Sequence, residues 1–116
     1  MLRNPHRVEV VPDQRHVRIE VGGELIADTR RALELRESHH SPRWYLPLED
    51  VRAGVLEPSE KTTHCPFKGD ATYYSVRAGG ELHRDLAWTY TDPIPAVSEI
   101  AGLVAFYDEK VDLTVG

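Results

Sequence analysis

Hydrophobic and polar residues alternate with a period of two over the first 35 residues, a pattern typical of β-strands with one buried face. The alternation is clearest in residues 17–21, Val-Arg-Ile-Glu-Val. Gly22 and Gly23 follow, and because glycine adopts positive φ at no steric cost, they predict a tight turn back onto residues 25–27. Residues 32–37 continue the pattern, so a meander of antiparallel strands is expected in this half of the chain.

The alternation is lost between residues 38 and 63. Three prolines interrupt this stretch, and only residues 48–53 show a helical spacing, over about a turn and a half. The prolines are Pro42, Pro47 and Pro58. A long loop region is therefore expected here, and loops on a rigid scaffold often carry function.

Strand-forming residues return in residues 71–77 and again in residues 82–90, with Gly79 and Gly80 between them. This arrangement predicts a second hairpin with a Gly-Gly turn. Arg-Ile-Glu-Val-Gly-Gly-Glu-Leu at residues 18–25 resembles Arg-Ala-Gly-Gly-Glu-Leu later in the chain. The likeness fits either an internal duplication or two ordinary turns of similar composition, and the second interpretation is favoured.

Near the C-terminal end, residues 96–101 predict one or two helical turns that stop at Gly102. Two runs of β-formers follow, residues 103–107 and 111–115, and a polar segment between them predicts a final hairpin. A continuous helix over residues 96–106 is the competing interpretation. Together the segments predict a mainly β, barrel-like domain of about seven or eight short antiparallel strands with one or two short helices.

Composition supports one globular domain over residues 1–116, because a chain of this length has room for one hydrophobic core. Arginine and lysine number 14 against 19 aspartate and glutamate, a net charge of −5 without a basic cluster, so no nucleic-acid partner is expected. No apolar run approaches the ~18 residues of a membrane span. The first residues also lack the apolar stretch of a secretory signal, so a cytoplasmic protein without membrane contact is expected.

Reactive side chains are densest in residues 62–70, Thr-Thr-His-Cys-Pro-Phe-Lys-Gly-Asp. Pro66 favours an extended Cys65 and presets a turn that brings Cys65 and Lys68 within ~7 Å at their Cα atoms, with Gly69 free to adopt positive φ. The Lys68 ammonium beside the thiol would favour the thiolate form and make Cys65 a nucleophile. The alternative is a buried, inert cysteine that acts as a small hydrophobic residue.

Cys65 is the single cysteine, which excludes an internal disulfide and a multi-thiolate metal site within one chain. His64 points away from Cys65 if the segment is extended, so the candidate proton carrier is His40, at the start of the loop region. A metal site built from His40, His64 and Asp50 or Asp70 is the weaker alternative. We therefore expect no metal and no other cofactor.

Aromatic residues follow the same segments and predict the walls of a pocket. Tyr73 and Tyr74 must face opposite sides of their strand, so one ring packs inside while the other lines the cavity, and Tyr74 is taken as the lining residue. Lys68 or Arg43 would meet an anionic group of the ligand. The expected ligand-binding residues are His64, Tyr45, Asp50, Tyr74 and Trp88, beside the catalytic candidates Cys65, Lys68 and His40.

Four ordered blocks of the chain resemble a known bacterial family, domain-of-unknown-function family 427, which also carries a nucleotidyltransferase label. Residues 37–51 resemble its Glu-Ser/Thr-x-His-x-Pro-x-x-Tyr-Ile-Pro-x-Glu-Asp-Val block, and residues 63–74 resemble its Cys-Pro-Tyr/Phe-Lys-Gly-x-Ala-x-Tyr signature. Residues 87–93 are similar to its Ala-Trp-x-Tyr segment, and residues 100–107 to its final block. The blocks cover most of residues 17–113.

The resemblance implies the β-tent fold shared with methionine sulfoxide reductase B and translationally controlled tumour protein. Many β-tent proteins hold zinc with two Cys-x-x-Cys pairs, which the single cysteine of this chain does not provide. The paired acidic metal ligands after a Gly-Ser motif, which the nucleotidyltransferase label implies, are also absent from the sequence. Fold likeness alone does not assign an activity.

The sequence thus predicts a small-molecule pocket around the Cys-Pro-Phe-Lys-Gly loop, in a protein that is a monomer or a homodimer. One hypothesis is an enzyme that acts on a small metabolite, with Cys65 as the reactive thiol. The alternative is a non-catalytic ligand-binding or protein-interaction module in which this loop has a structural role. Both hypotheses stay open from the sequence alone.

Overall fold

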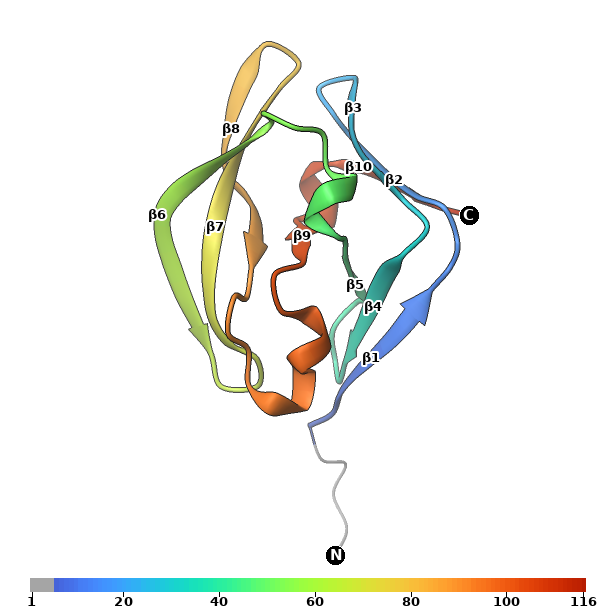
Figure 1. The fold of residues 1–116 in the computed structure, drawn as a ribbon, viewed down its shortest axis with the longest axis vertical. Helices are drawn as coiled ribbons and strands as arrows, with labels where there is room; N and C mark the ends of the chain where they lie inside the picture. The colour runs from blue at the N-terminus through green and yellow to red at the C-terminus, as the bar shows by residue number, and fades with distance from the viewer. Residues whose placement is uncertain (1–5) are drawn as a thin grey trace, which may run out of the picture.

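The structure is a computed structural model and describes residues 6–116. Within these residues the chain forms ten β-strands in three antiparallel sheets, together with three short 3-10 helices (Figure 1). The mainly β fold expected from the sequence is confirmed. No helix in this part of the chain is both long enough and apolar enough to cross a membrane.

Each sheet combines segments that are distant in the sequence. The first sheet has the order β1 (Val8–Asp13), β4 (Ala32–Glu37), β5 (Arg43–Tyr45). The second has the order β10 (Asp112–Val115), β2 (Val17–Val21), β3 (Glu24–Thr29). The third has the order β6 (Leu56–Cys65), β7 (Gly69–Ala78), β8 (Glu81–Thr89), β9 (Val104–Phe106). The 3-10 helices are η1 (Leu48–Asp50), η2 (Pro95–Ile100) and η3 (Asp108–Lys110).

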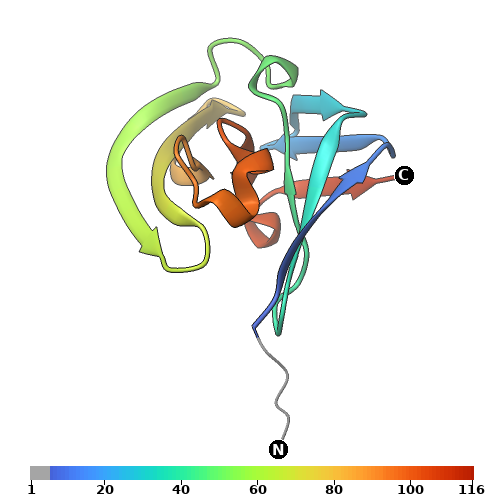
Figure 2. The same ribbon diagram turned by 60° about the horizontal axis from the view of Figure 1, so that its bottom comes forward.

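The strongly curved four-stranded sheet faces the two three-stranded sheets, and the hydrophobic core lies between them (Figures 1 and 2). Ile19, Leu46 and Phe106 are among the fully buried side chains of this core. A second cluster, richer in aromatic residues, lies between β1, β4, β8 and η2, which is drawn in orange at the lower centre of Figure 1. Leu46 and Val104 exchange two backbone hydrogen bonds, of 2.8 and 2.9 Å, and so join the first sheet to the third.

Both predicted Gly-Gly hairpins are confirmed, since β2 pairs with β3 and β7 pairs with β8. The predicted meander is wrong at its last step, because β4 pairs with β1 and β5 instead of β3. Alternation in residues 32–37 shows that this strand has a buried face. It does not show which strand lies beside it, and that choice depends on where the hydrophobic core forms.

The loop region expected over residues 38–63 is wrong for its last part, which belongs to strand β6. β6 is an edge strand, so a proline such as Pro58 is tolerated there and polar side chains point to solvent. The register with β7 also shifts between Pro58 and Thr62. An exposed, bulged edge strand has no hydrophobic alternation, which is why the sequence pattern missed it.

The predicted helical turn near residue 96 is confirmed as η2, and Gly102 follows it with a φ of 74°. The final hairpin and the alternative continuous helix are both wrong. β9 pairs with β8, and β10 pairs with β2 in a different sheet. β-Propensity predicted the two strands correctly. It did not predict their partners, because each strand packs against a different part of the core.

The two Gly-Gly turns touch each other where the β2–β3 and β7–β8 hairpins approach at the top of Figure 1. A Cβ atom added to Gly79 would lie 2.7 Å from the carbonyl oxygen of Gly22 and 2.9 Å from its Cα. The backbone N–H of Gly79 also donates a 3.1 Å hydrogen bond to the Glu24 carboxylate. That carboxylate accepts a second hydrogen bond, of 2.6 Å, from Arg52. Glycine is therefore required at position 79 for two reasons, the close approach of the Gly22 backbone and the positive φ of the residue itself.

We expect Gly79→Ala to lower the free energy of unfolding by about 2 to 4 kcal/mol, from the positive φ and the clash with Gly22 together. Gly80→Ala is the matched control, because Gly80 also has positive φ (80°) but has no atom within 4 Å of the added Cβ. It should lower the free energy by only about 1 to 2 kcal/mol. Urea denaturation measures both, and equal effects would contradict the contact between the turns.

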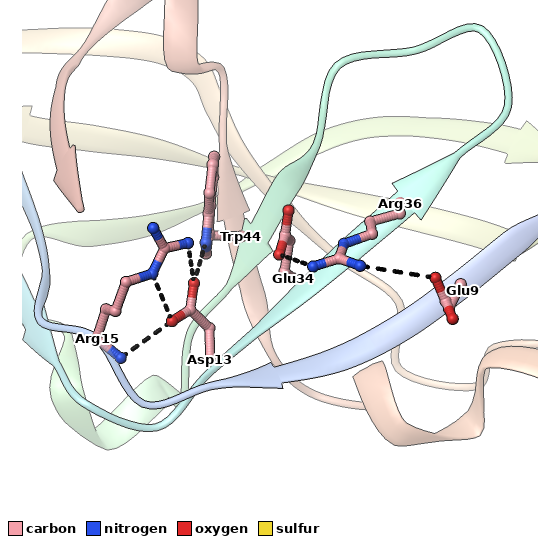
Figure 3. Close-up of polar contacts among 6 residues, drawn as sticks. All are labelled: Glu9, Asp13, Arg15, Glu34, Arg36 and Trp44. Carbon is pink, nitrogen blue, oxygen red and sulfur yellow. Dashed lines mark hydrogen bonds and ion pairs between the residues drawn. The ribbon is translucent and has the colours of Figure 1, made fainter. Parts of the chain in front are cut away.

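Asp13 anchors the far end of β1 through three side-chain hydrogen bonds (Figure 3). Arg15 donates two of them, at 3.0 and 2.8 Å, and the indole N–H of Trp44 donates one at 3.0 Å. The Arg15 hydrogen bonds hold the pKa of the Asp13 carboxyl well below its usual range, although its burial acts in the opposite direction. In the same sheet, Arg36 lies between Glu34 and Glu9 in a more exposed ion-pair network (Figure 3).

We expect Asp13→Asn to lower the free energy of unfolding by about 2 kcal/mol near neutral pH. A depressed carboxyl pKa stabilises the fold above the unfolded value of about 3.9 and loses this contribution as the pH falls below it. The difference between the parent and the variant should therefore shrink below about pH 4. Urea denaturation across pH tests this, with Glu49→Gln as an exposed control. A difference that does not change with pH would refute the assignment.

Candidate functional site

A cavity of about 500 Å³ lies beside the Cys65 turn, where the first and third sheets face each other. Its walls come from β4, β5, β7 and β8, from the β6–β7 turn and from the segments after β4 and β9. We call it the Cys65 pocket. Its lining residues are Leu35, Glu37, His40, Ser41, Arg43, Tyr45, Cys65, Lys68, Tyr73, Trp88, Tyr90 and Tyr107.

The turn that carries the thiol has the predicted form. The backbone N–H of Lys68 donates a 3.1 Å hydrogen bond to the carbonyl of Cys65, and Gly69 follows with a φ of 118°. The N–H of Ile94 donates a 2.9 Å hydrogen bond to the carbonyl of Lys68, which ties the turn to the segment before η2. Cys65 is a free, half-buried cysteine held in the pocket wall.

The Lys68 ammonium donates a 2.6 Å hydrogen bond to the carboxylate of Glu37. Both side chains are nearly buried, with exposed fractions of 11% and 12%. Burial raises the pKa of Glu37, but the hydrogen bond and charge of Lys68 outweigh it, so the pKa lies below its usual value. His6 contacts the second carboxylate oxygen at 2.9 Å. Lys68, expected to tune the thiol, is thus the partner of a carboxylate that the sequence analysis did not single out.

Aromatic rings form much of the pocket wall. The indole N–H of Trp88 donates a 3.1 Å hydrogen bond to the Tyr45 hydroxyl, and both side chains are buried. Tyr73 shares a 3.1 Å hydrogen bond with the hydroxyl of Thr63. The Arg43 guanidinium lies over the Trp88 ring, 5.3 Å from its centroid. These contacts fix ring orientations, so the wall is preformed.

Burial raises the pKa of Tyr45 and of Tyr90 far above the usual value for tyrosine. Burial, and to a lesser extent the neighbouring Tyr73 hydroxyl, raises the pKa of Tyr107 to about 12. All three phenols are therefore protonated at neutral pH and present O–H donors to the pocket region.

Of the eight residues predicted for the site, five line the Cys65 pocket. They are Cys65, Lys68, His40, Tyr45 and Trp88. His40 lies at the exposed rim, with its Nε2 atom 3.9 Å from the Glu37 carboxylate. Residue type and spacing therefore singled out five residues that the fold brings together in one cavity.

The remaining three residues lie elsewhere. His64 is exposed and contacts Asp70 at 2.6 Å on the outer face of the hairpin, because neighbouring residues of an extended strand face opposite sides. Asp50 accepts hydrogen bonds from Thr29 and Arg31 and lies outside the pocket lining.

Tyr74 lies on the opposite face of β7 from Tyr73, so the choice between these two tyrosines was wrong. It lines a separate groove with Leu48 and Leu56.

Four further residues line the pocket but were not predicted from the sequence, namely Glu37, Tyr73, Tyr90 and Tyr107. A usable signal existed for Tyr90, since it lies two residues after Trp88 and shares its strand face. Glu37 ends a predicted strand directly before the loop that contains His40, but nothing in the spacing linked it to Lys68. Within residues 6–116, no group of three or more His, Cys, Asp and Glu side chains is arranged to hold a metal ion.

The Glu37–Lys68 pair should show strong energetic coupling because both partners are nearly buried. In a double-mutant cycle with Glu37→Gln and Lys68→Met, we expect a coupling free energy of about 2 kcal/mol or more, measured by urea denaturation. The exposed pair of Arg77 and Glu57, also at 2.6 Å, is the control and should give less than about 1 kcal/mol. Additive effects of the first pair would show that the contact is not formed in solution.

Comparison with known proteins agrees with the resemblance seen in the four sequence blocks. A search of curated proteins found no match to the chain. A family model described as a domain of unknown function (DUF427) matches residues 9–116, which is nearly the whole chain and includes every residue of the Cys65 pocket. The chain therefore belongs to the DUF427 family.

Proposed function

We propose that this protein binds a small organic molecule in the Cys65 pocket. The observation that carries the proposal is the convergence of a thiol, a buried ion pair and several aromatic rings on one cavity. These groups come from distant parts of the chain, namely the ends of β4 and β5, the β6–β7 turn and β8.

The size and chemistry of the pocket support this proposal. Cavities that hold metabolites have volumes of roughly 300–1,000 Å³, with mostly apolar walls and a few placed polar groups. The Cys65 pocket has about 500 Å³, and its polar groups include the Glu37–Lys68 pair and the Arg43 guanidinium. Buried walls with fixed hydrogen bonds also reduce the entropy lost on binding.

We propose further that the protein is an enzyme, with Cys65 as the reactive thiol and His40 as the group that carries a proton at the pocket rim. The geometry in favour is that both residues line one cavity. The second candidate is a non-catalytic binding module. It is favoured by the hydrogen bonds of the turn, because the Lys68 ammonium pairs with Glu37 and the Lys68 carbonyl accepts from Ile94.

Two experiments test the binding proposal. A metabolite library is first screened for compounds that raise the unfolding temperature of the protein. The complex with each stabilising compound is then treated with iodoacetamide, which alkylates the thiol. Because Cys65 is the single cysteine of the chain, intact-mass measurement reports its alkylation alone. We expect a stabilising compound at saturation to slow alkylation about fivefold or more, since a ligand in a shared cavity shields the thiol. A library without stabilising compounds, or compounds that leave the alkylation rate unchanged, would refute the proposal.

Cys65→Ala then separates the enzyme from the binding module. For an enzyme, the parent protein should convert the compound to product, and the variant should bind it without turnover. For a binding module, the compound should stay intact with both proteins and bind them with equal affinity. Mass spectrometry of the compound after incubation distinguishes the two results.

A further inference from the structure

Two cations line the Cys65 pocket, and the structure distinguishes between them as partners for an anionic group of a ligand. The Lys68 ammonium already has a partner, because it donates a 2.6 Å hydrogen bond to Glu37 and both side chains are nearly buried. Drawing Lys68 toward a ligand would leave the nearly buried Glu37 carboxylate without its counter-charge, which is costly. Arg43 is therefore the cation that is left to meet a ligand.

Arg43 is held at the cavity by its strand and by two aromatic rings. It lies two residues before Tyr45 in β5, so both side chains project from the same face of the strand, and both line the pocket. The guanidinium carbon lies 5.3 Å from the centroid of the Trp88 ring and 5.6 Å from that of the Tyr107 ring. Both rings line the pocket as well. Cation–π attraction thus holds the guanidinium against the aromatic wall of the cavity.

The contacts of the Arg43 guanidinium use one of its three nitrogen atoms. Nη1 donates a 3.1 Å hydrogen bond to Glu109, and it lies 3.8 Å from the Asp108 carboxylate and 3.5 Å from the carbonyl oxygen of Phe106. Nε and Nη2 form no hydrogen bond with any residue of the described range 6–116. The side chain is 29% exposed. A guanidinium with N–H groups available in this way suits the two oxygen atoms of a carboxylate.

The charges around Arg43 favour a ligand with a single negative charge. Glu109, its closest ion-pair partner, is 61% exposed, so its carboxylate can return to water at little cost when a ligand takes its place. Asp108 and Glu37 remain near the pocket as fixed negative charges. A dianion such as a phosphate monoester would bring a second negative charge that no remaining cation of the lining matches, since Lys68 belongs to Glu37.

We propose that Arg43 is the anchor for the carboxylate of a small organic acid whose apolar or aromatic body lies in the Cys65 pocket. The proposal rests on the proposed small-molecule function and specifies the chemical class of its ligand. The rings of Trp88 and Tyr73 in the pocket wall suit a flat, unsaturated body next to the carboxylate.

Three probes with the same phenyl ring test the charge of the ligand, namely benzoate, benzamide and phenyl phosphate. Benzoate is a monoanion, benzamide is its uncharged counterpart of nearly equal shape, and phenyl phosphate approaches a dianion at neutral pH. We expect benzoate to bind most tightly in an NMR titration of the parent protein. Tighter binding of either other probe, or no binding of benzoate, would overturn the proposal.

Arg43→Gln removes the cation, so it should weaken benzoate binding about fivefold or more. It should change benzamide binding by less than about twofold, because an uncharged probe loses no ionic contact. Benzamide is thus the control for a merely structural role of Arg43, since a displaced aromatic wall would weaken both probes. Equal loss for both probes, or no loss for benzoate, would contradict the anchor.

Glu109→Gln gives a prediction of opposite sign. It removes the carboxylate that competes for Arg43, so benzoate should bind about 2- to 5-fold more tightly. Glu81→Gln is the matched control, because it removes the same charge from an exposed position at the far end of β8 and should leave the affinity unchanged. An equal gain in both variants would show a general charge effect and would refute a site at Arg43.

This proposal and the proposed function fail in different ways. If compounds of the metabolite library protect Cys65 from alkylation but Arg43→Gln leaves benzoate binding unchanged, the pocket is a ligand site and the anchor is wrong. If neither a library compound nor benzoate protects Cys65, the small-molecule function itself is wrong.

Discussion

The backbone hydrogen bonds between Leu46 and Val104 are the constraint on which the rest of the structure depends. They join the sheet of β1, β4 and β5 to the four-stranded sheet. Tyr45 precedes Leu46, and Ala105, the residue after Val104, is the register partner of Trp88. The bridge therefore sets the distance between Tyr45 and Trp88, and their hydrogen bond forms the inner wall of the Cys65 pocket. A shift of one residue in this bridge would turn Tyr45 to the opposite face of its strand, away from Trp88.

The pocket combines two kinds of electrostatic contact that are usually kept apart. On one side, Lys68 and Glu37 form a nearly buried ion pair. On the other, the buried phenols of Tyr45 and Tyr90 have raised pKa values and stay neutral, and the Tyr45 hydroxyl accepts a hydrogen bond from Trp88. The ion pair satisfies its own charges, so the two kinds of contact lie side by side in one cavity wall. Arg43 lies over the rings of Trp88 and Tyr107 and brings a cation to the same wall.

The sequence predicted the local features well and the long-range pairing poorly. Residues 17–29 fold as expected because alternation and a Gly-Gly turn act over a few residues. The Cys65 turn was also predictable, since Pro66 and Gly69 restrict the backbone directly. The partners of β4, β9 and β10 were not, because strand pairing depends on where the core forms and not on the strand's own residues.

The same distinction applies to the site. A local motif predicted that Cys65 and Lys68 line the pocket, whereas Glu37 was not predicted because its contact with Lys68 exists only after β4 and the β6–β7 turn meet. The choice between Tyr73 and Tyr74 failed for a related reason. Alternation guarantees that the two rings face opposite sides, but the register shifts of β7 against its neighbours decide which face meets the cavity.

The contact between the two Gly-Gly turns has a consequence for how this family varies. Both turns meet at one point, so the space available to each depends on the residue in the other. The first glycine of each Gly-Gly-Glu-Leu sequence is then explained by a common steric requirement, which does not need descent of one hairpin from the other. Across homologues, residues at positions 22 and 79 should therefore change together, and a larger residue at one position should accompany a displaced or shortened turn at the other.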